Sequence, residues 1–198
     1  MTIPLAWIFP VLAAQRLIEL WLSRRHFRRL SERGGREFAP ESFPWFVALH
    51  AGFLAALAWE GYPWRAPSDL RTWACLGALA VLMAGRYWCI ASLGDYWNTR
   101  IVVVPGAPRI RRGPYRWLPH PNYLVVALEF LVLPLLFRAP VTLVVFFPLN
   151  LLLLRQRIRL EESALAGAGC GKPGSERRTS NAERRTLNAE RGSQSTRK

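Results

Sequence analysis

The sequence predicts an all-α integral membrane protein with about five transmembrane helices, of which the last two form a hairpin. Of the 198 residues, 51% are hydrophobic, and these residues gather into long runs. The net charge is +14, and it comes from arginines that lie mainly between the runs. Basic charge beside apolar runs is typical of membrane proteins. The tryptophans lie mainly in or beside the runs, which argues against a nucleic-acid-binding domain.

Five apolar runs define the predicted spans. They cover residues 3–22, 43–61, 70–93, 123–137 and 141–154. A bilayer core needs roughly 20 residues of helix, and the first three runs meet this length. The last two are shorter and each contains a proline, so we interpret them as tilted or locally thinned spans that turn back at Arg138-Ala139-Pro140. A re-entrant pair is the alternative.

The charges of the connecting segments predict the orientation of the chain. Arginines are abundant in the loop at residues 23–42, in the polar segment at residues 94–122 and after the last run, and they are sparse in the other two loops. The positive-inside rule places arginine-rich segments in the cytosol. Five spans satisfy this rule at every loop if the N-terminus is outside and the C-terminus is cytosolic. We therefore expect a multi-pass protein of the bacterial inner membrane.

The chain divides into a transmembrane domain at residues 1–165 and a tail at residues 166–198. We interpret the first run as a retained span and not as a removed signal peptide, because no basic region precedes it and charged residues interrupt it. The tail repeats SERRTSN, AERRTLN and AERGSQS with almost no apolar residues, so we expect a disordered basic extension. The three cysteines form no Cys-x-x-Cys pair, so we expect neither a disulfide framework nor a metal site.

Four ionisable residues fall at membrane depth, where charge is costly and usually serves function. Arg16 and Glu19 lie three residues apart on one helical face and can pair with each other. Arg86 and Glu129 lie close to the polar segment, which makes them candidate catalytic residues. The alternative for all four is an internal ion pair or hydrogen bond between helices. The same alternative applies to two polar residues inside other apolar runs, His50 and Asn150.

The polar segment ends in a turn that presents one histidine. Pro119 and Pro121 flank His120 and hold its backbone extended. Asn122 is expected to be the N-cap of a helix that starts at Tyr123. His120 is therefore expected at the cytosolic entrance of the fourth span, although a simple capped turn has the same sequence.

A second polar cluster, RQRIRLEESAL, follows the last run at residues 155–165. Arg157 and Glu161 are four residues apart and share a helical face, and Glu162 adjoins them. The hairpin makes the outer ends of the last two spans neighbours on the cytosolic side. An imidazole, a guanidinium and two carboxylates then converge, and such a set can bind a zwitterionic amino acid. An ordinary solvated helix end is the alternative.

GPYRWLPHPNYL, the apolar hairpin and RIRLEESAL together resemble the isoprenylcysteine carboxyl methyltransferase family. Its members are integral-membrane enzymes that use S-adenosylmethionine without the soluble Rossmann fold, and this sequence has no strand, Gly-rich turn and helix unit either. The family pattern is Arg-His-Pro-x-Tyr before the hairpin and Arg-x-x-x-Glu-Glu after it. The resemblance covers about residues 10–165. Pro119 stands where the family has arginine, and Arg116 or Arg112 could replace that arginine from nearby.

The resemblance implies that the motif residues hold S-adenosylmethionine, namely His120, Pro121, Tyr123, Arg157, Glu161 and Glu162. We expect Arg86 and Glu129 nearer the acceptor. The family name implies a prenylated cysteine carboxylate as acceptor, which is already ionised and needs no base. Bacterial relatives suggest a long-chain phenolic or pyrone lipid instead, for which Glu129 or His120 would be the base. Either acceptor would enter from the membrane lipids, and the sequence leaves the choice open.

Two other interpretations stay open. The protein could be another lipid-modifying enzyme with a similar C-terminal hairpin, such as a phospholipid N-methyltransferase or a sterol reductase. It could also be a non-enzymatic transporter or scaffold whose intramembrane arginines and glutamates form an ion path. The second interpretation gives no reason for the two paired motifs.

Overall fold

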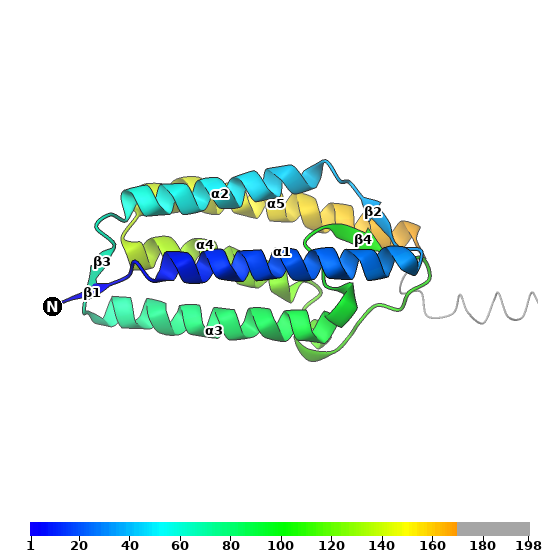
Figure 1. The fold of residues 1–198 in the computed structure, drawn as a ribbon, viewed down its shortest axis with the longest axis horizontal. Coiled ribbons are helices and arrows are strands. Elements are labelled where there is room, and N and C mark those ends of the chain that lie inside the picture. Colours follow the sequence, from blue (N-terminus) through cyan, green and yellow to red (C-terminus); the bar gives the residue numbers. More distant parts are fainter. Residues whose placement is uncertain (170–198) are drawn as a thin grey trace, which may run out of the picture.

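Five helices form an up-and-down antiparallel bundle in residues 1–169, the part of the chain that the structure, a computed structural model, describes (Figure 1). In chain order they are α1 (Ile8–Glu32), α2 (Ser42–Glu60), α3 (Leu70–Leu93), α4 (Pro121–Phe137) and α5 (Pro140–Gly167). Two short 3-10 helices, η1 (Gly94–Tyr96) and η2 (Gly113–Arg116), lie in the polar segment. The predicted disordered tail falls almost entirely on residues 170–198, outside the described residues.

Three helices of the described chain are long and apolar enough to cross a membrane. They are α2, α3 together with η1, and α5. The shorter α4 is also apolar but has only 17 residues. The 25-residue α1 carries charged residues along much of its length. Three of the five predicted spans therefore lie on membrane-capable helices, whereas the first lies on a more polar helix and the fourth on a shorter one.

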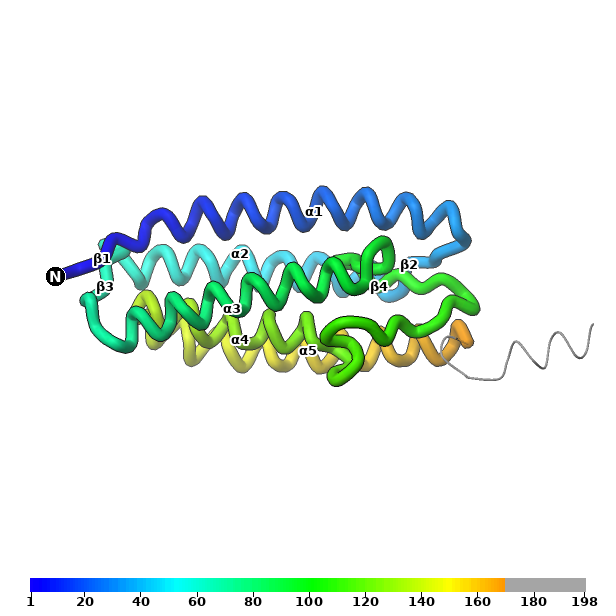
Figure 2. Tube along the Cα trace, turned by 90° about the horizontal axis from the view of Figure 1, so that it is seen from below, coloured from blue at the N-terminus to red at the C-terminus, as the bar shows by residue number. Residues whose placement is uncertain are grey.

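Two short antiparallel strand pairs join the loops at the ends of the bundle. At one end β1 (Thr2–Pro4) pairs with β3 (Arg65–Pro67). At the other end β2 (Arg36–Phe38) pairs with β4 (Ile101–Val103). The two arginine-rich loops therefore lie at the same end of the bundle as the C-terminal end of α5. The N-terminus and the α2–α3 loop lie at the opposite end (Figure 1 and Figure 2). The all-α prediction misses these pairs because strands of three residues show no alternating pattern.

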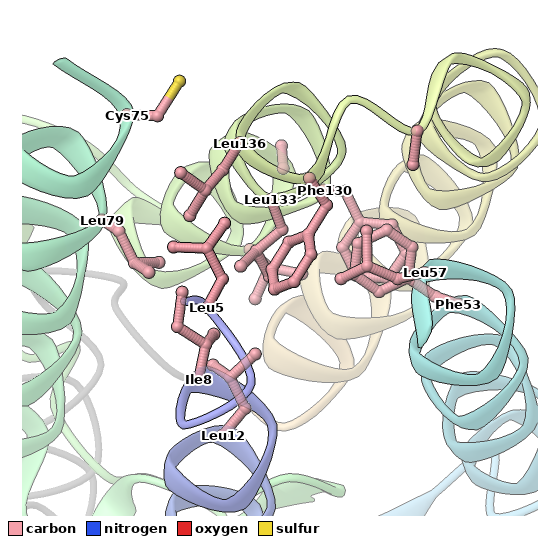
Figure 3. Packing of buried hydrophobic residues seen from close by; sticks show 14 of the residues in the cluster. Leu5, Ile8, Leu12, Phe53, Leu57, Cys75, Leu79, Phe130, Leu133 and Leu136 are labelled. Carbon is pink, nitrogen blue, oxygen red and sulfur yellow. The ribbon is translucent and has the colours of Figure 1, made fainter. Parts of the chain in front are cut away.

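The main apolar core lies around α4, toward the end of the bundle that carries the N-terminus. Figure 3 shows side chains from α1, α2, α3 and α4 meeting there. Phe130 of α4 stacks on Phe53 of α2 with ring centroids 4.0 Å apart. Leu5, which precedes α1, is fully buried in the same cluster. This core holds the helices at one end and leaves polar groups to be buried toward the other end.

The predicted loop at residues 23–42 is wrong over its first half, because α1 continues to Glu32. Ser23 and His26 are buried on the face that also buries Gln15 and Glu19. This stripe has helical spacing but is polar, so a search for apolar runs cannot find it. The polar stripe is what places the second half of α1 against the rest of the protein.

The predicted cap of the fourth helix is also wrong, because α4 begins at Pro121 with His120 as its N-cap. Proline is favoured at the first helical position, where its missing N–H needs no partner. Asn122 lies in the first turn, and its Oδ1 is buried without a hydrogen-bond partner among the described residues. The predicted break of the hairpin is confirmed, since α4 ends at Phe137, its C-cap Arg138 is left-handed, and α5 begins at Pro140.

One carboxylate connects α2 to the hairpin. Glu60, the last residue of α2, accepts hydrogen bonds from the backbone N–H groups of Val141 at 2.8 Å and Thr142 at 2.7 Å. It also accepts one from the Thr142 hydroxyl at 2.7 Å. N–H groups in the first turn of a helix have no partner within the helix. Glu60 therefore caps α5 from a different helix.

Replacing Glu60 with alanine removes these three hydrogen bonds. We expect the free energy of unfolding in detergent to fall by about 1–2 kcal/mol, the usual effect of a lost cap. Thermal and denaturant unfolding followed by circular dichroism measures this change. The control is Glu32→Ala at the exposed end of α1, for which we expect less than about 0.5 kcal/mol. Equal losses in the two variants would contradict the capping role.

Candidate active site

The two sequence motifs meet where α4 begins and α5 nears its end. The His120 Nε2 atom lies 2.9 Å from Glu162 Oε1. The Tyr123 hydroxyl donates a hydrogen bond to Glu161 Oε2 at 2.6 Å. The rings of His120 and Tyr123 stack with centroids 5.4 Å apart and planes inclined by 12°. The predicted convergence of the histidine with the two carboxylates is therefore present in the structure.

Among the motif residues, Arg157 is the one whose charge is least compensated by its hydrogen-bond partners. Its exposed fraction is 4%, and its guanidinium donates to the Thr99 carbonyl and to the Tyr123 hydroxyl, the latter at 3.4 Å. It also lies over the Phe46 ring, 4.7 Å from the centroid. Its Nη1 is buried without a hydrogen-bond partner among the described residues. A buried cation with a free donor is costly, and a bound anion would remove that cost.

A first cavity of about 330 Å³ lies between the polar segment and the end of α5. His120 and Glu162 line it, together with the aromatic side chains of Tyr115 and Trp117. Burial, with a smaller contribution from the nearby Glu161 carboxylate, raises the pKa of the Tyr115 phenol. The volume lies within the range of small-molecule sites.

Several arginines also line the first cavity. Arg116, which sequence analysis names as a replacement for the missing family arginine, is among them, whereas Arg112 is exposed at the start of η2. Arg109 lines the same cavity and forms an ion pair with Glu162. The sequence does not single out Arg109, because it is one of several arginines in an irregular segment without helical spacing. The cavity therefore has guanidinium groups although Pro119 occupies the motif position.

The polar segment is held against α5 by apolar and backbone contacts. Ile101 and Val103 of β4 are buried in a small cluster with Ala164 of α5. The backbone N–H of Gly106 donates to the Ala168 carbonyl at 3.2 Å. The segment therefore forms one wall of the first cavity.

A second cavity of about 230 Å³ is lined by residues of the first four helices and by Trp97, Asn98 and Thr99 of the polar segment. Most of its lining is apolar, with Leu20, Phe46 and Val126 among the contributing side chains. Tyr123 lines this second cavity, whereas its stacking partner His120 lines the first. The stacked pair of rings thus lies between the two cavities.

The predicted catalytic residues Arg86 and Glu129 belong to a buried network of two arginines and two glutamates. Arg86 Nε donates to Glu129 Oε1 at 3.0 Å, and Arg86 Nη1 lies 3.3 Å from Glu19. Arg16 completes the network with contacts of 2.7 Å to both Glu19 and Glu129. The predicted pairing of Arg16 with Glu19 is therefore confirmed. The exposed fractions of Arg86 and Glu129 are 2% and 1%.

The structure divides the candidate residues between two places. The motif residues gather around the stacked rings, and Pro121 starts the helix that carries Tyr123. Arg86 lines the second cavity with Arg16, Glu19 and His50, whereas Glu129 lies behind it with both oxygens held by arginines. Asn150 is fully buried in α5, and its side chain has no hydrogen-bond partner among the described residues.

Comparisons with known proteins agree with the motifs. The model of the isoprenylcysteine carboxyl methyltransferase (ICMT) family matches residues 75–167, which include both motifs and the hairpin. The uncharacterized protein YpbQ of Bacillus subtilis is 40% identical over 162 residues, which are 80% of this chain and 94% of YpbQ. An uncharacterized protein of Haemophilus influenzae is 26% identical over 159 residues, 80% of this chain and 92% of that protein. No solved structure matches the chain significantly. The chain belongs to the isoprenylcysteine carboxyl methyltransferase family.

Proposed function

We propose that the protein is an integral-membrane, S-adenosylmethionine-dependent O-methyltransferase that acts on a lipidic acceptor. Family membership supports a membrane methyltransferase. The choice of cofactor rests on one observation: Arg157 is buried, and its Nη1 lacks a hydrogen-bond partner among the described residues. This free donor lies in a cluster with the Tyr123 hydroxyl and Glu161.

The charges of the motif residues suit the amino-acid part of S-adenosylmethionine. This part would have to extend beyond the first cavity, because Arg157 and Glu161 line neither cavity. The Arg157 guanidinium would hold its carboxylate, and Glu161 and Glu162 would hold its ammonium group. Tyr115 and Trp117, which line the first cavity, offer ring faces to a positively charged sulfur. When bound, the cofactor supplies an electrophilic methyl group. Arg109 and Arg116, both at the first cavity, provide the guanidinium that Pro119 cannot.

The protein's own residues orient the reactants and exclude water. The polar segment covers the first cavity, and the stacked rings of His120 and Tyr123 lie between it and the second. Direct methyl transfer requires contact between the two partners, so we place it at the edge of the stacked rings, where the two cavities approach each other. Partners held in place there lose little further entropy on reacting. For a hydroxyl acceptor, the candidate base is His120, whose ring is oriented by Glu162 at 2.9 Å from Nε2 and by Glu161 at 3.8 Å from Nδ1. A carboxylate acceptor needs no base.

The second cavity is the proposed site of the acceptor. Its largely apolar lining suits a prenyl or alkyl chain that arrives through the bilayer. The four charges of the adjoining network neutralise one another, and Glu129 is held by two arginines. Both oxygens of Glu129 are already bonded to arginines, so we assign Glu129 to the internal network and Arg86 to the wall of the acceptor cavity.

The proposed topology has five spans with the active site on the cytosolic side of a bacterial inner membrane. The arginine-rich loops and the C-terminal end of α5 lie at one end of the bundle, together with both motifs (Figure 1). The positive-inside rule assigns this end to the cytosol.

Membranes that contain the protein should transfer radiolabelled methyl groups from S-adenosylmethionine to extractable lipid or protein. Arg157→Gln should lower the affinity for S-adenosylmethionine in calorimetry by about 10- to 100-fold, the effect of losing hydrogen bonds to a charged group. The control is Arg159→Gln, an exposed position two residues further along the same helix, which should bind normally. Unchanged binding by a folded Arg157→Gln protein would contradict the proposal.

The product distinguishes the acceptor class. We expect methyl label in an ester, which mild base releases, or in an ether, which mild base leaves in the lipid. Recovery of the label in a methylated phospholipid amine would contradict O-methyl transfer. Hydrolysis followed by lipid and protein extraction makes this comparison.

Reporter fusions test the topology. Alkaline phosphatase, active only in the periplasm, should be active when inserted in the loop at residues 62–69 and inactive when fused after residue 169. An active C-terminal fusion would contradict the five-span arrangement.

A further inference from the structure

One face of α1 carries a buried polar stripe. Gln15, Glu19, Ser23 and His26 follow helical spacing, and their exposed fractions lie between 3% and 6%. Buried polar groups cost free energy unless they are hydrogen-bonded. The family match begins at residue 75, so this stripe lies outside it.

Ser23 is bonded to the chain that follows η1. Its hydroxyl donates to Asn98 Oδ1 at 2.7 Å and lies 2.7 Å from Thr99 Oγ1. The Ser23 hydroxyl has a single proton, so Thr99 is the donor in that second contact. The backbone N–H of Thr99 also donates to the Ser23 hydroxyl at 3.1 Å. One buried side chain thus fixes both the backbone and the side chain of Thr99.

Two further residues of α1 hold the chain just before this point. His26 Nδ1 donates to the Trp97 carbonyl at 2.7 Å. Arg29 Nη1 donates to Asp95 Oδ1 at 2.7 Å. Together with Ser23, these contacts fasten residues 95–99 to α1, so the segment cannot move independently of that helix.

The segment that Ser23 fixes is in direct contact with Arg157. The Thr99 carbonyl accepts a hydrogen bond from Arg157 Nη2, and Arg157 Nε donates to the Tyr123 hydroxyl at 3.4 Å. The guanidinium is planar, so these two contacts also set the direction of its third nitrogen. That third nitrogen, Nη1, is the one without a partner among the described residues. A displaced Thr99 carbonyl would therefore turn the free donor.

We propose that Ser23 is a positioning residue of the cofactor site. It fixes Thr99, whose carbonyl aims the free Nη1 of Arg157 at the carboxylate that this arginine binds. This role rests on the proposed function, because it takes Arg157 as a ligand of the cofactor. The N-terminal helix thereby contributes to a site whose sequence motifs both lie in the last third of the described chain.

Ser23→Ala in the full-length protein should raise the Kd for S-adenosylmethionine about fivefold, the loss expected for one net hydrogen bond. The KM for S-adenosylmethionine should rise by a similar factor, while kcat changes less than about twofold, because the reacting groups are untouched. The matched control is Ser31→Ala on the same helix. The Ser31 hydroxyl is bonded to the Phe27 carbonyl of its own helix, so both constants should stay unchanged.

Measuring the effect of Ser23→Ala in the Arg157→Gln background tests whether Ser23 acts through Arg157. In that background Ser23→Ala should have no further effect on the Kd, since the group that it positions is gone. Thr99→Val removes the hydroxyl beside Ser23 and keeps the backbone. This variant should raise the Kd about twofold, and it replaces Ser23→Ala in the cycle if that protein does not fold.

An unchanged Kd in Ser23→Ala, with Arg157→Gln still weakening binding, overturns the positioning role and leaves the proposed function intact. An equal effect of Ser23→Ala in both backgrounds also overturns it, because Ser23 would then act on the fold as a whole. An unchanged Kd in Arg157→Gln overturns the proposed function and the positioning role with it.

Discussion

The contact between the first turn of α4 and the last turns of α5 is the constraint on which the site depends. Tyr123 reaches Glu161 across 38 residues of sequence, and His120 reaches Glu162 across 42. They meet because α4 ends at Phe137, its C-cap Arg138 is left-handed, and α5 begins at Pro140. A connection this short leaves little freedom for one helix to slide along the other. The hairpin therefore fixes which turn of α5 faces His120, and the cap from Glu60 ties that hairpin to α2.

The protein buries its arginines in two different ways. Arg86 contacts Glu19 and Glu129, and Arg16 completes a network of equal positive and negative charge. Arg157 is also buried, but its hydrogen-bond partners are a carbonyl and a phenol, both neutral. A compensated network needs no ligand, whereas an uncompensated cation gains free energy from a bound anion. This contrast supports the proposal that the first set belongs to the bundle and the second cavity, whereas Arg157 binds the cofactor.

Apolar runs in the sequence predict most of the bundle. The bounds expected for the third helix are those of α3, and the second predicted span differs from α2 by one residue at each end. Both motifs are local patterns, and spacing together with the family resemblance predicts their residues. Two features could not be found this way. The second half of α1 is held by polar groups such as Ser23 and His26, which a hydropathy pattern counts as loop. The contact of Arg109 with Glu162 joins an irregular segment to a helix 53 residues away, and it depends on tertiary structure.

The claim that the two motifs form one site is tested most directly by a double-mutant cycle. The cycle combines Tyr123→Phe with Glu161→Gln and measures the affinity for S-adenosylmethionine. If the hydrogen bond between these side chains organises the site, the double variant should lose less affinity than the sum of the two single losses, with a coupling of about 1 kcal/mol. Losses that add to within about 0.3 kcal/mol would mean that the two residues act independently. That result would contradict a single site built by the hairpin.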